Sequence, residues 1–332
     1  MLIFEHGGRD PYLNLAIEDA LADSLAEDCF LTWRVEPSLV IGRYQDIFAE
    51  VDLPEARRLG VPVVRRRSGG GAVYNDGETL FYTFIVNYHG KRLEFGEYTE
   101  IAAEALRRVG VPALAGGRND ISADGRKISG CAAFVSGEKA VVHGTLLFGC
   151  DTGRLAALLR PSPLKLAAKG VPSVRGRVGE IKDFLAPGTT IDDFRREFCD
   201  EMRRALGSPP VCAPDEELMR AADAIAAARY RDSQWLYVRG KPDGVRAEAR
   251  FPGGTVVVWL RAAGSVITDL SIYGDFFSKN GVDAVEKALI GVKCQETDIA
   301  NALGRLDLEQ YIEGVGAEEL AGLLGQCLAH QQ

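Results

Sequence analysis

The chain has 332 residues, of which 46% are hydrophobic and 26% charged, and its formal net charge is -8. These are the values of an ordinary globular protein, and the length favours two domains. The acidic balance argues against a general nucleic-acid binder, and we expect neither secretion nor membrane association, because no signal peptide and no membrane-spanning apolar run is recognisable. The seven cysteines are scattered without a C-x-x-C pair, which predicts reduced thiols in a cytoplasmic protein and no zinc site.

The first regular element is a helix predicted at residues 11–27. Its apolar side chains recur at helical spacing, Asp10 is the expected N-cap, and Pro11 occupies the first helical position. Short apolar runs at residues 30–35 and 38–41 follow as predicted strands. The helix is therefore expected to pack on a sheet.

A run of arginines and glycines comes next. The β-branched residues Val61, Val63 and Val64 predict a buried strand that ends at three arginines, residues 65–67, and a triple glycine, residues 69–71. Ordering three glycines is costly in backbone entropy, so the run indicates a positive φ or a ligand against the backbone. Bare amides can point at a carboxylate or phosphate while arginines supply charge. A hairpin turn with exposed arginines is the alternative, and the glycines alone do not decide between them.

Strand and helix signals continue after the glycines. Residues 72–74 and 79–86 flank Asn75-Asp76-Gly77, a turn type that favours a β-hairpin. A helix is predicted at residues 98–109, with Gly110 at its end. The segment that follows has the pattern of a strand meander.

Lys127 is the strongest single candidate for chemistry. If residues 126–134 form a strand, alternation places Lys127 on one face with Ser129, Cys131 and Ala133, and the even-numbered residues on the other. These neighbours are small, so the lysine stem has room to cross the floor of a cavity. An edge-strand lysine that prevents aggregation is the alternative.

A cationic, glycine-punctuated loop is expected at residues 162–179. It carries Lys165, Lys169, Arg175 and Arg177, which suggests a flap that orders on an anion; a charged surface loop is the alternative.

Two other side chains have two readings each. His143 is either a polar contact to a nucleotide or a structural histidine at a strand end. Cys131 is either a nucleophile or a small buried thiol.

Composition changes at residues 207–214, G-S-P-P-V-C-A-P, which we interpret as a linker. A helix at residues 216–229, three strands separated by P-G-G and A-A-G turns, and further helices follow. They are sufficient for a separate small α+β domain.

Five motifs occur in order: R-R-R-S-G-G-G-A-V-Y, R-N-D-I, G-R-K-I-S-G, H-G-T-L-L-F and K-G-V-P-S-V-R-G-R-V. In this order they resemble the lipoate-protein ligase A family, and the likeness extends over residues 1–207. The tail, with R-F-P-G-G and G-D-F-F, resembles that family's C-terminal accessory domain. An ordered set is far more specific than any single motif, so it favours the functional reading of each.

The resemblance implies an α+β fold whose large catalytic domain, residues 1–207, has mixed β-sheets flanked by helices. Such a domain is related to the catalytic domains of biotin ligases and class II aminoacyl-tRNA synthetases. A linker at residues 208–214 and a small α+β accessory domain at residues 215–332 complete the expected organisation, and we expect a monomer.

The resemblance also implies a reaction in two steps. Lipoate and ATP, with Mg²⁺, give lipoyl-AMP and pyrophosphate. The lipoyl group then passes to a specific lysine of a lipoyl domain of a 2-oxoacid dehydrogenase E2 subunit or of glycine-cleavage H protein.

Carried over position by position, the resemblance implies a set of lipoate- and adenylate-binding residues: Arg66, Ser68, Gly69, Gly70, Gly71, Val73, Tyr74, Asn119, Asp120, His143, Gly144, Thr145, Lys169, Ser173, Val174 and Arg177. Lys127 matches the catalytic lysine that contacts the acyl carbonyl and the α-phosphate, and Asp120 is the expected Mg²⁺ contact. We expect an apolar tunnel for the acyl chain around Val73, Tyr74, Phe84 and Ala133. Asn75 departs from the family pattern, because relatives often have histidine there.

Three rival functions remain to be weighed. A lipoyl or octanoyl transferase of the same fold would use a cysteine acyl-enzyme without ATP, and Cys131 and Cys150 leave this open. A biotin ligase is disfavoured because the G-R-G-R-R run is missing. A non-catalytic lipoate-binding protein would keep the pocket but not the charged residues that the reaction needs. This chain keeps both Lys127 and the basic loop, which argues against that alternative.

Overall fold

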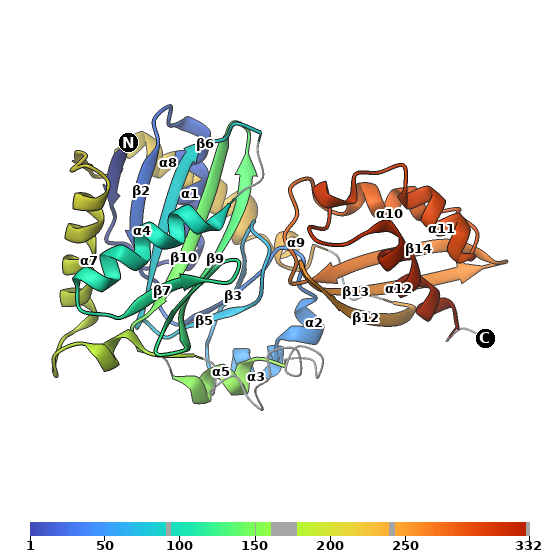
Figure 1. Cartoon of the computed structure of the whole chain (residues 1–332), viewed down its shortest axis with the longest axis horizontal. Helices are drawn as coiled ribbons and strands as arrows, with labels where there is room; N and C mark the ends of the chain where they lie inside the picture. The colour runs from blue at the N-terminus through green and yellow to red at the C-terminus, as the bar shows by residue number, and fades with distance from the viewer. Residues whose placement is uncertain (91–93, 150, 161–177, 239–242, 330–332) are drawn as a thin grey trace.

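An eight-stranded mixed sheet forms the centre of the larger of two lobes in the computed structural model, which describes residues 1–90, 94–149, 151–160, 178–238 and 243–329 (Figure 1). Its strands, in spatial order, are β11 (Val211–Cys212), β1 (Leu2–Glu5), β2 (Cys29–Trp33), β6 (Thr79–Asn87), β10 (Lys139–Leu147), β9 (Arg126–Ser136), β8 (Asp120–Ala123) and β7 (Ala113–Gly116). Strand β1 runs parallel to β2 and β11, and the other neighbours are antiparallel.

A second, three-stranded sheet carries the arginine and glycine run. Strand β3 (Ser38–Ile41) lies between β4 (Val63–Arg65), to which it is parallel, and β5 (Val73–Asn75), to which it is antiparallel. The triple glycine connects β4 to β5. Short helices α2 (Ile47–Glu50), α3 (Leu53–Arg58) and α5 (Thr152–Leu158) lie beside this sheet (Figure 1).

Helices cover both faces of the large sheet. Helix α1 (Pro11–Ser24) begins as predicted, because Asp10 accepts hydrogen bonds from the amides of Tyr12 and Leu13. On the other face lie α4 (Phe95–Arg108) and α7 (Ile191–Ala205), which share a hydrophobic core with the sheet. The sheet is thereby sandwiched between two helical layers.

The chain after α7 stays with the large lobe. Val211 pairs with Ile3 in the large sheet. Helix α8 (Glu216–Ile225) and the π-helical turn after it (Ala226–Tyr230) pack against α1, and Tyr230 donates to the buried carboxylate of Asp19.

The boundary predicted at residues 208–214 is therefore misplaced, and the helix predicted for the small domain at residues 216–229 belongs to the large lobe. Proline and glycine composition marks irregular chain but does not decide which core a following helix joins. A short helix, α9 (Ser233–Leu236), ends the large lobe, so we define the large lobe as residues 1–238 and the small lobe as residues 243–329.

The small lobe has its own core beneath an antiparallel meander. Strands β12 (Val245–Phe251), β13 (Gly254–Ala263) and β14 (Val266–Gly274) pack with α10 (Asp283–Leu289), α11 (Glu296–Leu303) and α12 (Ala317–Ala329). The predicted α+β class, with a large mixed-sheet domain and a small α+β domain, is confirmed. Within the described ranges, no helix has the length and hydropathy of a membrane span.

Candidate active site

A cavity of about 420 Å³ lies between the two lobes. Most of the residues implied by the family resemblance line it: Arg66, Gly70, Gly71, Val73, Tyr74, Asn119, Asp120, Lys127, His143, Gly144 and Thr145. Ser68 and Gly69 lie behind this lining. Lys169, Ser173, Val174 and Arg177 fall outside the described residues, as do Lys165, Arg175 and Cys150. The motifs, which are far apart in the sequence, therefore meet in one place.

The apolar part of the lining differs from the expected tunnel. Val73 and Tyr74 border the cavity, whereas Phe84 and Ala133 belong to the core behind the sheet. The apolar side chains that line it instead, and that sequence reasoning missed, include Leu15, Trp33, Val40, Phe81, Ala132, Leu147 and Leu155. They come from α1, β2, β3, β6, β9, β10 and α5, and no local pattern indicates that these elements converge.

The three arginines of the R-R-R run have separate roles. Arg65 donates to the carbonyls of Gly42, Arg43 and Gln45, and so holds backbone. Arg67 pairs with the buried Asp19, at 3.0 Å. Neither lines the cavity, so only the middle arginine is at the site.

Arg66 fixes the triple-glycine turn from inside. Its Nη2 donates to the carbonyls of Gly69 (2.6 Å) and Gly71 (2.8 Å), and its Nε donates to Ser68 Oγ (2.9 Å). Burial lowers the pKa of Arg66 to about 10, so the guanidinium stays protonated at neutral pH. Gly70 has φ +86°, a left-handed conformation that suits glycine. The turn is therefore preformed around a buried positive charge.

A hydrogen-bonded chain leads from this turn to helix α1. Ser68 Oγ lies 2.7 Å from His143 Nε2, and His143 Nδ1 lies 2.9 Å from Glu18 Oε2. Thr83 donates to the other oxygen of Glu18, at 2.5 Å. Glu18 is buried and was not singled out from the sequence, where it is one more residue of an amphipathic helix. The chain orients the His143 ring at the cavity wall.

Lys127 and Asp120 form the charged centre of the cavity. Lys127 Nζ lies 2.5 Å from Asp120 Oδ1, and about a quarter of each side chain is exposed. A Cβ added to Gly130 would lie 2.5 Å from Lys127 Nζ. The absent side chain at Gly130 therefore leaves the space that the ammonium group occupies.

The simple alternation predicted for Lys127 is wrong. Strand β8 pairs Ser122 with Lys127 but Ile121 with Ser129, so a β-bulge adds one residue to β9 between them. The lysine consequently lies over Gly130, which uniform alternation assigns to the opposite face.

Cys131 borders the cavity, but its thiol is buried against Tyr82. The Tyr82 hydroxyl lies 2.8 Å from Sγ, and burial raises the pKa of the Cys131 thiol to about 12. The thiol is therefore protonated at neutral pH, which favours a buried structural cysteine over a nucleophile.

Asn75, the departure from the family pattern, is completely buried at the end of β5, opposite Ser38 of β3. It lies beside the cavity and is not part of its lining.

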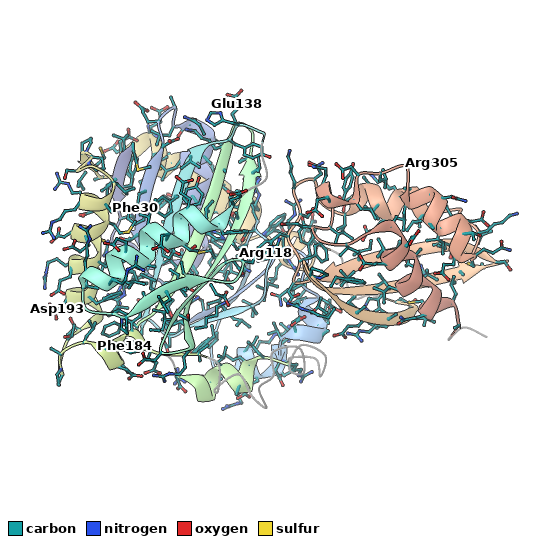
Figure 2. All side chains as sticks on the ribbon, in the orientation of Figure 1. Phe30, Arg118, Glu138, Phe184, Asp193 and Arg305 are labelled. Carbon is teal, nitrogen blue, oxygen red and sulfur yellow. The ribbon has the colours of Figure 1, made fainter. Side chains whose placement is uncertain are left out.

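The small lobe closes one side of the cavity with Arg250, Pro252, Gly253, Gly254, Asp275 and Phe277. Arg118 joins the lobes at their junction in Figure 2: its Nη1 donates to the Gly253 carbonyl (3.0 Å), its guanidinium lies 4.5 Å from the Phe277 ring centroid, and it forms an ion pair with Glu313. The site is thus built by both lobes.

Comparison with known proteins identifies the class to which this fold and cavity belong. Residues 10–203 match the family described as lipoyl protein ligase A/B catalytic domain, and residues 244–324 match the bacterial lipoate protein ligase C-terminus. The chain belongs to the lipoate-protein ligase family.

Individual proteins agree along almost the whole length. The chain is 33% identical over 320 residues to lipoate-protein ligase LplJ of Bacillus subtilis, a match that covers 95% of this chain and 97% of that one.

Two solved structures share the fold. The crystal structure of P. falciparum LipL1 in complex with lipoate superposes with a TM-score of 0.78 at 19% identity and covers 100% of this chain and 99% of its own. The crystal structure of a lipoate-protein ligase A bound with ATP has a TM-score of 0.59 at 24% identity and covers 70% of this chain and 96% of its own. The second match of the family profiles begins at residue 244, which agrees with a small lobe that starts after α9.

Proposed function

We propose that this protein is an ATP-dependent lipoate-protein ligase. It joins lipoate to the α-phosphate of ATP, releases pyrophosphate, and passes the lipoyl group from lipoyl-AMP to a lysine of an acceptor protein. The observation that carries this proposal is the pairing of Lys127 and Asp120 in one cavity with a glycine turn that contains the buried Arg66.

The activation step follows from the chemistry of the two substrates. A carboxylate does not acylate an amine unaided, and an acceptor lysine with an ordinary pKa near 10.4 is mostly protonated at neutral pH. When the carboxylate approaches the α-phosphate, two unit negative charges at about 4 Å repel each other by roughly 4 kcal/mol at the effective dielectric of a protein surface. A fixed positive charge at this point lowers the barrier.

Lys127 suits that role because its ammonium is already held at the cavity by Asp120, 2.5 Å away. In the proposed first step, the lipoate carboxylate oxygen forms a bond to the α-phosphorus and the bond to the pyrophosphate oxygen breaks. Lys127 stabilises the charge that builds on the five-coordinate phosphorus. In the second step the acceptor amine attacks the acyl carbonyl and AMP leaves.

Arg66 contributes mainly through position. Its Nη2 group donates hydrogen bonds to the carbonyls of Gly69 and Gly71 and so holds the glycine turn in one conformation. The turn has no side chains, so its backbone faces the cavity directly, beside the buried guanidinium. The apolar walls formed by Trp33, Val40 and Phe81 suit the dithiolane and its alkyl chain.

The residues of the cavity fit a Mg²⁺ ion that is held mainly by the nucleotide and by one protein carboxylate. Among the described residues there is no cluster of three or more candidate ligands, so a cage made only of protein groups is not available there. Mg²⁺ bound to nucleotides commonly takes one or two carboxylates together with phosphate oxygens and water. Asp120 would supply the carboxylate, and the ion would neutralise phosphate charge.

The acceptor is proposed to be a lipoyl domain of a 2-oxoacid dehydrogenase E2 subunit or glycine-cleavage H protein. The family likeness to named lipoate-protein ligases supports a protein acceptor. The protonated state of Cys131 disfavours the alternative of a transferase with a cysteine acyl-enzyme.

The test is lipoate-dependent ATP–pyrophosphate exchange. We expect the wild-type protein to exchange with lipoate and not with biotin, and Lys127→Ala to abolish exchange. Lys182→Ala is the matched control, because Lys182 is also ion-paired, with Glu180 at 2.8 Å, but does not line the cavity. A wild-type protein that shows no exchange and instead transfers octanoate from an acyl carrier protein would refute the proposal.

A further inference from the structure

The cations that line the cavity differ in how much of their hydrogen-bonding capacity is already used. Arg66 is bonded to backbone carbonyls and Ser68, Lys127 is paired with Asp120, and Arg118 is bound to the small lobe. Arg250, at the end of β12, bonds only through Nη1 to other described residues. Its Nε and Nη2 groups therefore remain available to a ligand.

The guanidinium of Arg250 is nevertheless held in place. Its Nη1 donates to Asp275 Oδ1 (3.1 Å) and Thr255 Oγ1 (3.0 Å), and the same carboxylate oxygen accepts from the Thr255 amide (2.6 Å). The Arg250 side chain is 38% exposed, and the residue borders the cavity. A positioned arginine with an open edge of donors is suited to bidentate recognition of phosphate oxygens.

The position of Asp275 is tied to the large lobe. The amide of the preceding residue, Gly274, donates to the Tyr44 carbonyl across the lobe junction (2.9 Å), and the Tyr44 ring stacks on Phe276 with 5.0 Å between centroids. Docking of the small lobe therefore determines where Arg250 meets the cavity.

The turn that follows Arg250 has glycine at residues 253 and 254, and the structure requires glycine there. A Cβ on Gly253 would lie 1.5 Å from the Glu313 carbonyl oxygen, and Gly254 has φ +147°. Both positions thus require glycine, and the turn borders the cavity with backbone alone. It faces the same cavity as the glycine turn of the large lobe.

We propose that Arg250 binds the β- and γ-phosphates of ATP, so that the small lobe supplies a substrate-binding residue for the activation step. This inference rests on the proposed function. The α-phosphate belongs at Lys127, and the rest of the triphosphate needs cationic donors that are not already engaged. Release of pyrophosphate would then remove the ligand that joins Arg250 to the nucleotide.

The test compares binding of ATP and AMP to the full-length protein by isothermal titration calorimetry. Arg250→Gln keeps the size and polarity of the side chain but removes the charge. Loss of charged hydrogen bonds to phosphate is expected to weaken ATP binding about tenfold or more, with AMP affinity unchanged. Arg250→Lys, which keeps the charge without the planar fork, should fall between Arg250→Gln and wild type.

Arg261→Gln is the matched control. Arg261 lies in the neighbouring strand β13, is paired with Asp269 at 2.9 Å, and does not border the cavity. Its substitution should leave both affinities unchanged.

The outcomes separate this inference from the proposed function. If Arg250→Gln binds ATP as the wild type does, or loses ATP and AMP affinity equally, the inference is overturned. If the wild type shows no lipoate-dependent exchange but Arg250→Gln selectively weakens ATP binding, the phosphate site stands and the ligase reaction does not. A wild type that binds no ATP overturns both.

Discussion

Gly69→Ala provides a direct test of how the two lobes are held together. A Cβ at Gly69 would lie 2.2 Å from the Phe276 carbonyl oxygen of the small lobe and 3.2 Å from Phe277 Cα. Gly69 does not have a positive φ, so alanine fits the backbone and the effect is limited to this contact. Since real Cβ contacts of this kind are essentially never under 3.0 Å, the lobes must separate locally by about 1 Å.

The displacement falls on interactions that join the lobes. The Gly70 amide is 3.4 Å from the Phe276 carbonyl, already at the limit of a hydrogen bond, while the Gly274 amide and Arg118 make closer bonds across the junction. An aromatic stack contributes about 0.5–1.5 kcal/mol and each net hydrogen bond a similar amount, so about 3 kcal/mol of docking free energy is at risk. That is roughly a hundredfold shift toward the undocked state.

Small-angle X-ray scattering measures the outcome. We expect Gly69→Ala to increase the radius of gyration while circular dichroism and the melting transition of each lobe stay as in wild type, because each lobe has its own core. Gly71→Ala is the control in the same turn, since nothing lies within 4 Å of its added Cβ. Identical scattering from both variants would refute the docking argument.

Three further predictions concern the cavity. Gly130→Ala should displace the Lys127 ammonium, whose Nζ would be 2.5 Å from the new Cβ, and so reduce ATP–pyrophosphate exchange about a hundredfold. The melting temperature should change little, because the end of a lysine side chain is flexible and can move. Unchanged exchange would contradict the role proposed for Lys127. Cys131→Ser should retain exchange, and a trapped thioester in the wild type would contradict this. The same variant should lose less stability as the solution becomes alkaline. Burial raises the pKa of the Cys131 thiol from 9.0 to about 12, so the stability that the protonated thiol contributes is complete below pH 9 and is lost as pH rises from 9 to about 12, by about 1.4 kcal/mol per pH unit. Urea titrations of both proteins at about pH 8 and about pH 10 measure this difference in the free energy of unfolding.

Local sequence determined several features of this protein. Asp10 and Pro11 set the start of α1, because capping and the fixed φ of proline act within one helical turn. The ordered motifs predicted that Lys127, Asp120 and the triple glycine lie close together, and Lys127, Asp120, Gly70 and Gly71 do line one cavity. The turn signals between the last three strands predicted the meander of the small lobe.

The tertiary structure decided what depends on partners distant in the chain. The bulge opposite Ile121 and Ser122 reverses the face predicted for Gly130 relative to Lys127, and a bulge is a property of two paired strands. Glu18 gains its place beside His143 only because α1 packs on the sheet at that point.

The same distinction explains the position of the lobe boundary and the side of the cavity that the small lobe closes. Composition marked residues 208–214 as irregular, but burial against α1 decided that α8 belongs to the large lobe. The sequence indicates no role in the site for Arg250 and Phe277. They line the cavity only because the small lobe docks against the large lobe. Spacing along the chain encodes secondary structure and motif identity, whereas the partners that a side chain meets are fixed by the lowest free energy of the whole fold, in which the burial of apolar surface between distant segments is the dominant favourable term.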